Sequence, residues 1–292
     1  MIGVLNIAKP GGMTSHDVVA QVRRRLGTKR VGHAGTLDPM ATGVLVVAVG
    51  PATRFLQYMS LEPKVYEAEI QFGITTDSYD ADGNQTETRP LPADLNGLVD
   101  KALTSFSGKI VQLPPMYSAV KVQGKALYQY ARKGEEVERK ERPVFVETFD
   151  VAWISSGLAK SHIVCSGGTY VRSLAHDLGE AVGCGAHLSA LHRSRVGPYQ
   201  SSGSIPLDEV AAEKLIPLVD ALAPMRMVQV NEVQIDHVRH GRVVAMKEEF
   251  DVRFVGLTGA DGTVIGVARA EGNRLHPECV LPSEAIDHVS VH

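Results

Sequence analysis

Apolar residues recur along the chain with two different periods, and together they predict a protein built from both helices and strands. In residues 15–26 they fall on one face of a helix, and Thr14 or Ser15 can cap its first turn. Residues 44–49 form an unbroken apolar run between two glycines, which is typical of a strand buried on both faces. In residues 66–72 apolar and polar side chains alternate, which indicates a half-buried strand.

The rest of the chain adds a loop, two helices and a hairpin to this prediction. Three glycines and a proline in residues 30–43 predict a loop just before the buried strand. Residues 95–106 have helical spacing, and so does a segment in which Leu174, Leu178 and Val182 recur every four residues. Apolar segments on either side of the turn-forming residues 259–262 predict a hairpin.

The composition divides the chain into two domains. Prolines punctuate the chain around residues 206–224, and short β-like segments follow. We therefore expect a large domain over residues 1–226 and a small β domain over residues 227–292. Residues 116–142 are strongly charged and only weakly apolar, so we expect them to project from the large domain.

The projecting segment combines basic and aromatic side chains. Lys121, Lys125 and Arg132 lie there beside three tyrosines, as on a surface that follows an RNA backbone and stacks bases. Four glutamates between residues 135 and 141 make its charge mixed. A solvated surface without a ligand is therefore the alternative interpretation.

Composition and charge narrow the classes of function. The 292 residues are 44% hydrophobic and 22% charged, as in an ordinary globular protein. The chain has no apolar run of the roughly 18 residues that span a membrane and no secretory signal pattern at its start, so we expect a cytoplasmic protein. Three widely spaced cysteines fit a reducing compartment. The net charge of -3 argues against binding nucleic acid through overall charge, so that any such binding depends on local basic patches.

Residues 32–43 contain the strongest candidate for chemistry. Asp38 precedes Pro39, which favours an extended backbone at the aspartate, and the nearby glycines allow a bulky ligand to approach. Because a buried strand follows at once, this carboxylate lies on a tight loop that is anchored to rigid structure. Taken alone, the pattern is also typical of an aspartate that only organises a turn.

Four other patterns resemble known sites but lack a required feature. Residues 9–12 do not have the order of a nucleotide-binding phosphate loop, and residues 80–84 lack the last ligand of a calcium loop, so we interpret the latter as a turn. The histidines do not pair with cysteines at zinc spacing. A nucleophilic Cys165 assisted by His162 is disfavoured, because the two would face opposite sides of a strand. We expect no metal site.

A series of sequence blocks resembles the TruB family of bacterial tRNA pseudouridine synthases. The segment from Gly32 to Gly43 is similar to the family's signature around its catalytic aspartate. Further blocks occur in the family's order at residues 9–15, 65–66, 113–121, 168–174 and 183–191. The resemblance covers roughly residues 1–200, and the tail is similar to the family's PUA-type RNA-binding module.

The resemblance implies a role for each matching residue. Asp38 would be the catalytic aspartate, Arg172 would pair with it and hold it ionised, and Tyr66 would stack on the target base. His33 would lie against the RNA and keep the flipped nucleotide out of its stack. The remaining implied contacts are Leu191 and Tyr170 with the substrate, and Lys9, Lys121, Lys125 and Arg132 with the RNA.

The implied fold is an α+β domain of the pseudouridine synthase type, with helices flanking a mixed, mainly antiparallel sheet, followed by a small β-barrel-like PUA-type domain. The implied reaction isomerises the uridine at position 55 in the T loop of tRNA. It moves the ribose C1′ bond from N1 to C5 of uracil without a redox step, so we expect no cofactor. The expected partner is the T arm of tRNA, bound by a monomer without a protein partner. Two alternatives stay open: a non-catalytic RNA-binding or tRNA-folding protein, and a pseudouridine synthase for another RNA.

Overall fold

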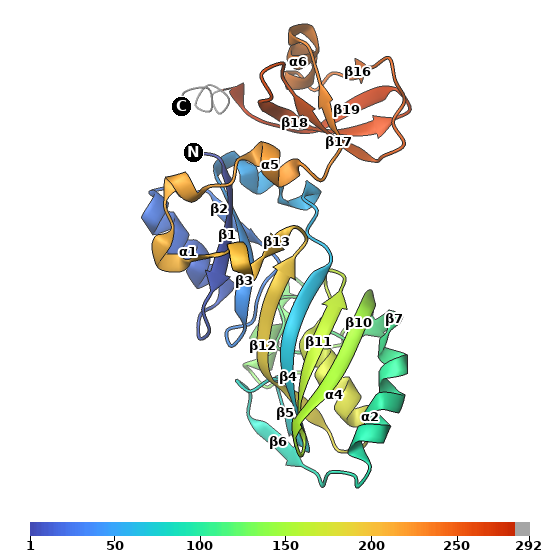
Figure 1. Ribbon diagram of the computed structural model, residues 1–292. Coiled ribbons are helices and arrows are strands. Elements are labelled where there is room, and N and C mark those ends of the chain that lie inside the picture. The colour runs from blue at the N-terminus through green and yellow to red at the C-terminus, as the bar shows by residue number, and fades with distance from the viewer. Residues whose placement is uncertain (284–292) are drawn as a thin grey trace.

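A large mixed sheet organises the N-terminal part of the molecule (Figure 1). The computed structural model describes residues 1–283. The ten strands of this sheet are β1 (Gly3–Lys9), β2 (Val31–Ala34), β3 (Thr42–Val49), β4 (Lys64–Phe72), β7 (Gly108–Gln112), β10 (Arg142–Ser155), β11 (Leu158–Cys165), β12 (Ala186–Val196), β13 (Tyr199–Gln200) and β14 (Ile205–Pro206). They lie in the order β14-β1-β3-β12-β4-β11-β10-β7, with β2 beside β3 and β13 beside β12. The pairs β1–β14 and β3–β12 are parallel and the other pairs are antiparallel, which confirms the predicted mixed, mainly antiparallel sheet.

Helices pack against both ends of this sheet. Helix α1 (Ser15–Leu26) begins with a capping box around Thr14, ends at the left-handed Gly27, and packs its apolar face on β1 and β3. The predicted helix at residues 95–106 is α2 (Leu95–Leu103), followed by a 3-10 turn. The other helices are α3 (Leu127–Ala131), α4 (Val171–Ala181), α5 (Leu218–Leu222) and α6 (Glu232–Arg239). The 3-10 turns are Gly50–Arg54, Leu56–Tyr58, Thr104–Phe106, Ser201–Gly203, Leu207–Glu209 and Ala212–Lys214.

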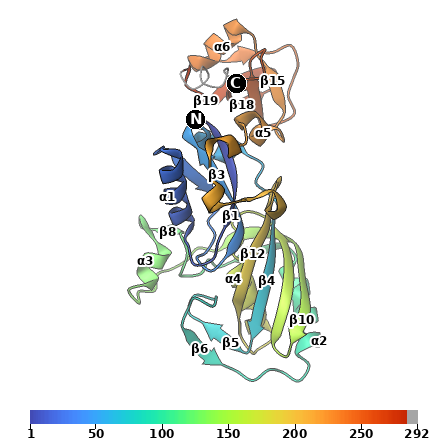
Figure 2. The same ribbon diagram turned by 60° about the vertical axis from the view of Figure 1, so that its left-hand side comes forward.

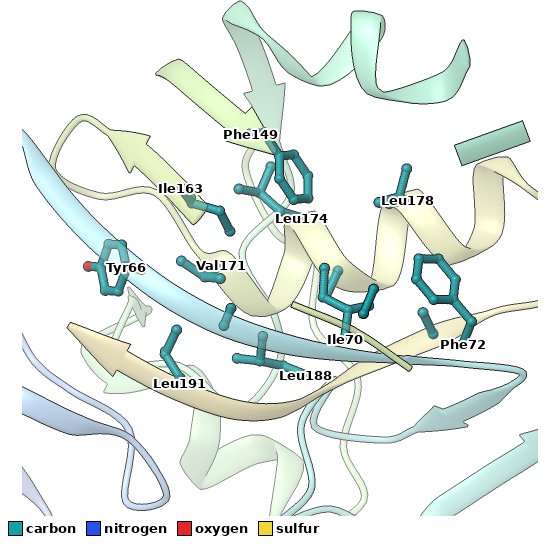
Figure 3. Packing of buried hydrophobic residues seen from close by; sticks show 14 of the residues in the cluster. Tyr66, Ile70, Phe72, Phe149, Ile163, Val171, Leu174, Leu178, Leu188 and Leu191 are labelled. Carbon is teal, nitrogen blue, oxygen red and sulfur yellow. The ribbon is translucent and has the colours of Figure 1, made fainter. Parts of the chain in front are cut away.

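The main core lies between α4 and the sheet (Figure 3). Leu174 and Leu178 are one helical turn apart on α4 and therefore point to the same side, where they pack in one cluster with Ile70 and Phe72 of β4. Tyr66, Val171 and Leu191 belong to the same cluster. The packing that stabilises this domain therefore extends to the residues expected to bind the substrate.

The predicted loop over residues 30–43 is partly wrong. Residues 31–34 form β2, which pairs antiparallel with β3 from Val31 opposite Val49 to Ala34 opposite Val46. The glycines in this segment suggested a loop, but Val31 is buried in the core formed with α1, and this tertiary contact outweighs the local tendency. The irregular part is therefore confined to residues 35–41, and Asp38 lies in the middle of it.

The charged segment 116–142 projects from the N-terminal part, and α3 lies at its outer end (Figure 2). It contains a short hairpin of β8 (Lys121–Val122) and β9 (Lys125–Ala126), followed by α3. A second small hairpin, β5 (Ile74–Thr76) with β6 (Gln85–Thr88), extends from the end of β4. Its connection, residues 77–84, contains the turn that was predicted at residues 80–84.

A second, curled sheet of five strands forms the C-terminal part, in the β-barrel-like arrangement that was predicted (Figure 1). Its order is β15-β17-β18-β19-β16. The predicted hairpin is β17 paired antiparallel with β18. The strands are β15 (Met227–Gln229), β16 (Val244–Ala245), β17 (Phe254–Thr258), β18 (Val264–Glu271) and β19 (Arg274–Val280). The last nine residues of the expected 227–292 domain lie outside the described residues. Within residues 1–283, none of the helices has the length and apolar character needed to cross a bilayer.

Candidate active site

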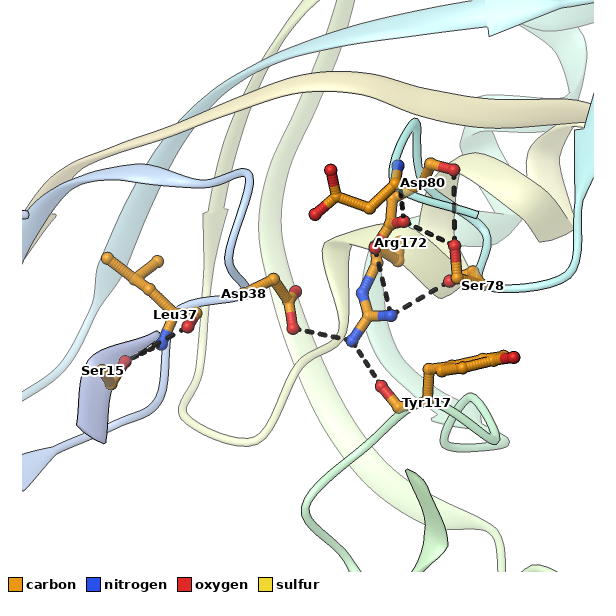
Figure 4. A network of polar contacts seen from close by, with 8 residues as sticks. Ser15, Leu37, Asp38, Ser78, Asp80, Tyr117 and Arg172 are labelled. Atoms are coloured by element: carbon orange, nitrogen blue, oxygen red, sulfur yellow. Dashed lines mark hydrogen bonds and ion pairs between the residues drawn. The ribbon is translucent and has the colours of Figure 1, made fainter. Parts of the chain in front are cut away.

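Buried polar contacts hold the backbone of the loop of residues 35–41 in place. Lys9, the last residue of β1, donates from Nζ to the carbonyl oxygens of Pro10, Pro39 and Ala41, at 2.8, 3.2 and 2.6 Å. On the other side of Asp38, the Leu37 amide donates to the Ser15 hydroxyl at 2.9 Å, and that hydroxyl donates to the Leu37 carbonyl at 3.1 Å (Figure 4). The catalytic candidate is therefore held on a loop whose backbone is tied down on both sides.

The structure does not place Lys9 where it could bind RNA. Its side chain is 1% exposed and lies beneath the loop. Burial lowers the pKa of Lys9 to about 8, against the opposing effect of the Asp38 carboxylate. The expected phosphate contact at Lys9 is thus corrected, because this ammonium group is used to anchor the loop backbone.

Arg172, near the start of α4, connects the parts of the site. Its Nη2 donates to Asp38 Oδ1 and to the Tyr117 carbonyl, both at 2.8 Å. Its Nη1 donates to the Ser78 carbonyl at 3.0 Å and lies 3.2 Å from Asp80 Oδ2. Figure 4 shows these groups converging on the guanidinium from three separate segments. A planar guanidinium suits this arrangement because its donors have fixed directions.

The two carboxylates paired with Arg172 differ in exposure. The Asp38 side chain is 30% exposed and can reach a ligand, whereas Asp80 and Arg172 are each 4% exposed. Burial raises the pKa of Asp80, and the adjacent guanidinium opposes that rise. Asp80 therefore acts as an internal counter-ion, and Asp38 is the carboxylate that faces outward.

A pocket of about 200 Å³ opens beside Asp38. Four further residues expected from the sequence line it together with Asp38: Tyr66, Tyr170, Arg172 and Leu191. Tyr66 and Leu191 come from the neighbouring strands β4 and β12. Burial raises the pKa of the Tyr66 phenol, which keeps its proton at neutral pH. The pocket thus combines an aromatic ring, an apolar side chain and one outward-facing carboxylate.

His33 and the basic surface residues lie outside this pocket. His33, on β2, packs edge-on against His16 with ring centroids 5.5 Å apart. Its Nδ1 is buried without a partner among the described residues, and burial lowers its pKa to about 4. Lys121, Lys125 and Arg132 are exposed on the projecting segment, where the Arg132 guanidinium lies 5.4 Å from the centre of the Tyr128 ring.

Three residues of the site were missed in the sequence. Asp80 was assigned to a turn and Ser78 to no site, and both hold Arg172. Arg193 is fully buried and donates to the carbonyl oxygens of Val44 and Gly35, at 2.9 and 3.0 Å. No local sequence pattern around Arg193, on β12, indicated such a role. Within the described part of the chain, no three His, Cys, Asp or Glu residues are arranged to hold a metal ion.

Known structures and protein families resemble this chain in both fold and sequence. The chain is similar to one titled "Crystal Structure of a Cbf5-Nop10-Gar1 Complex", with a TM-score of 0.70 and 27% identity over 97% of this chain and 86% of that one. The fold is that of the pseudouridylate synthases, a class of isomerases. Within that class, the chain belongs to the TruB family: residues 23–171 match "TruB family pseudouridylate synthase (N terminal domain)".

Two further family descriptions match the remaining sequence. Residues 172–228 match "tRNA pseudouridylate synthase B C-terminal domain", and residues 227–281 match "Pseudouridine synthase II TruB, C-terminal". Among proteins named tRNA pseudouridine synthase B, one from Thermobifida fusca is 45% identical over 96% of this chain and 98% of its own length. Another, from Symbiobacterium thermophilum, is 49% identical over 84% of each chain.

Proposed function

We propose that this protein isomerises uridine to pseudouridine in tRNA, at position 55 of the T loop, with Asp38 as the essential carboxylate. The observation that carries the proposal is the Asp38–Arg172 pair, 2.8 Å apart, at a pocket lined by Tyr66 and Leu191. The name shared by the relatives, tRNA pseudouridine synthase B, supports tRNA as the substrate.

The chemistry of the reaction fits these groups. The bond from ribose C1′ to uracil N1 breaks, a bond from C1′ to C5 forms, and the proton on C5 moves to N1 through the solvent. A carboxylate such as Asp38 can attack or assist at the reacting carbon while Arg172 keeps it oriented. The detached base must stay in place between these steps, and stacking on Tyr66 with packing against Leu191 would hold it there.

The target nucleotide must leave its stack before it can enter the pocket. Flipping a base costs a few kcal/mol, which contacts in the pocket and along the RNA offset. The exposed cations Lys121, Lys125 and Arg132 are suitably placed on the projecting segment to contact phosphates of the T arm. We further propose that the protein acts as a cytoplasmic monomer without a protein partner, and that residues 227–283 add RNA contacts.

The test is release of tritium from C5-tritiated uridine in a full-length tRNA transcript. The wild-type protein should release close to one proton per tRNA. Asp38→Asn should release none while retaining tRNA affinity, because the substitution keeps the shape and removes the charge. Asp82→Asn, which neutralises an exposed aspartate near the site, serves as the matched control and should behave as wild type. Binding without release by the wild type would instead favour a non-catalytic RNA-binding protein.

The position of the target is tested separately. A transcript in which uridine 55 is replaced by cytidine should release no tritium above background, although it should still bind. Release from the replaced transcript at the wild-type rate would mean that another uridine is the target. Release from an unrelated structured RNA at the same rate would favour a synthase with a different substrate.

A further inference from the structure

The turn that holds Arg172 from behind has an unusual backbone. Ser78 offers a carbonyl oxygen and Asp80 a carboxylate oxygen to the same guanidinium nitrogen, Nη1 (Figure 4). Between them, Tyr79 has a φ of 66°, in the left-handed region. A bulky residue occupies this region when surrounding contacts hold it there. The contacts of Ser78 and Asp80 with Arg172 therefore depend on the interactions that hold Tyr79 in this conformation.

The side chain of Tyr79 is stacked on His176. The two ring centroids are 3.7 Å apart and the ring planes differ by 9°. His176 lies four residues after Arg172, one turn further along the same face of α4. The helix that carries the arginine thus also carries the ring that holds the turn. Backbone bonds of 3.0 Å, from Leu188 N–H to the Tyr79 carbonyl and from Ala81 N–H to the Leu188 carbonyl, attach the turn to β12.

The contacts of His176 indicate what its ring contributes. Its Nδ1 is buried and has no hydrogen-bond partner among the described residues. Burial also lowers the pKa of His176, so the imidazole is neutral at neutral pH. Neither His176 nor Tyr79 lines the pocket beside Asp38. His176 therefore contributes by stacking the face of its ring on Tyr79.

We propose that the Tyr79–His176 stack positions the catalytic pair. It fixes the left-handed turn, the turn fixes Ser78 and Asp80, and these hold the Arg172 guanidinium that orients Asp38. The role rests on the proposed function, because it serves the reaction at Asp38. Loss of the stack would let Tyr79 return to a common backbone conformation and shift Arg172. Small displacements of catalytic groups lower the rate strongly without a matching change in substrate binding.

The stack is tested with paired variants. His176→Leu removes the ring from one side, and Tyr79→Leu removes it from the other with a residue that disfavours the left-handed backbone. Each should lower kcat about five- to twentyfold and leave the KM for tRNA within about twofold. His176→Phe and Tyr79→Phe keep the rings and should restore kcat to near the wild-type value. Phe106→Leu breaks another aromatic pair of this domain, Phe106 with Phe149, and should leave kcat unchanged.

A second readout does not require activity. Amide hydrogen exchange in residues 76–84 should become faster in His176→Leu and stay unchanged in Phe106→Leu. Unchanged exchange in His176→Leu would overturn the positioning role, and so would an unchanged kcat or a failure of the phenylalanine variants to restore it. If the wild type releases no tritium, the proposed function fails, and the exchange measurement then decides the role of the stack by itself.

Discussion

At the scale of single residues, the site depends on how one guanidinium is shared. Arg172 uses Nη2 for Asp38 and the Tyr117 carbonyl, and Nη1 for Ser78 and Asp80. A buried cation of this kind is stabilised because carboxylates balance its charge and acceptors bind both of its terminal Nη groups. Asp80 therefore influences the partly exposed Asp38 through a common partner, although Asp80 does not line the pocket.

Replacing Asp80 tests this coupling. Asp80→Asn removes a charge that pairs with Arg172, so the guanidinium should shift and the orientation of Asp38 should be lost. We expect kcat for pseudouridine formation to fall about ten- to hundredfold, with tRNA affinity within about twofold. The free energy of unfolding should fall by about 1–3 kcal/mol. Asp82→Asn, two residues on and exposed, is the control for both measurements. Equal kcat values for Asp80→Asn and the wild type would exclude the coupling.

His33 leads to a prediction about pH and stability. Its pKa falls from 6.5 to about 4 on folding, chiefly through burial, with smaller effects from His16 and Arg193. The unfolded chain therefore binds more protons than the folded chain between these pH values, and the folded state loses stability as the pH falls from about 6.5 to about 4.

Urea unfolding at pH 7, 5.5 and 4.5 measures this loss. His33→Gln removes the titrating group, so its unfolding free energy should decline less steeply with falling pH than that of the wild type. His162→Gln replaces a half-exposed histidine that pairs with Glu67 at the surface, and should follow the wild type closely. Parallel pH curves for the wild type and His33→Gln would contradict the assignment of a partly buried, neutral His33.

At the scale of elements, the sequence predicts what depends on neighbours along the chain. Helix α1 was predicted with its correct ends, because the cap at Thr14, the apolar face and Gly27 are all local signals. Strand β2 was missed, because its glycines favour a loop and its pairing with β3 is a tertiary contact. Ser78 and Asp80 were missed for the same reason. Ser78 contacts Arg172, which lies 94 residues away in the sequence, and no local pattern around either residue indicates the contact.

The candidate site was predicted from two different sources. Glycines and a proline identify the tight loop around Asp38, which is a local signal. Tyr66, Leu191 and Arg172 have no distinctive pattern of their own and were assigned through the blocks that resemble the family. The structure brings these residues together at one pocket, whereas it places Lys9 beneath the loop. A lysine next to Pro-Gly-Gly has no sequence feature that separates an exposed cation from a buried anchor.

Variants of two lysines, Lys9 on β1 and Lys121 on β8, distinguish a lysine that anchors the loop backbone from one that binds RNA. Lys9→Met removes three bonds to the loop that carries Asp38, so it should lower the free energy of unfolding by about 1–3 kcal/mol and reduce kcat. The slope of log Kd against log salt for tRNA should stay as in the wild type. Lys121→Met should do the reverse, leaving stability unchanged and making the slope shallower by roughly one. Fluorescence titrations with tRNA at four salt concentrations and urea unfolding give both quantities. A shallower slope for Lys9→Met would restore its role as a phosphate contact.

At the scale of the whole molecule, the two parts of the chain share a core. One apolar cluster contains Val44 and Phe55 from the N-terminal part together with Val264 and Val267 from β18. Tyr58 meets Phe254 edge-on with ring centroids 5.2 Å apart, and Arg54 donates to the Val280 carbonyl at 3.0 Å. Burial of apolar surface between the parts favours unfolding as one cooperative unit, with the C-terminal sheet held at a fixed orientation to the pocket.

Cooperative unfolding is testable because Trp153, on β10, is the only tryptophan of the chain and reports on the N-terminal part. Val255 is fully buried in the separate core of the C-terminal sheet. Val255→Ala should lower the unfolding free energy by about 1–3 kcal/mol. If the parts unfold together, the urea midpoint reported by Trp153 fluorescence should shift accordingly, although the substitution lies in the other sheet. Val233→Ala, the same change at an exposed position of α6, should leave that midpoint in place. The contrary result would be a Trp153 midpoint that stays in place in Val255→Ala while hydrogen exchange shows the C-terminal sheet unfolding at lower urea. The shared cluster would then be too weak to couple the two parts, and the C-terminal sheet could move relative to the pocket.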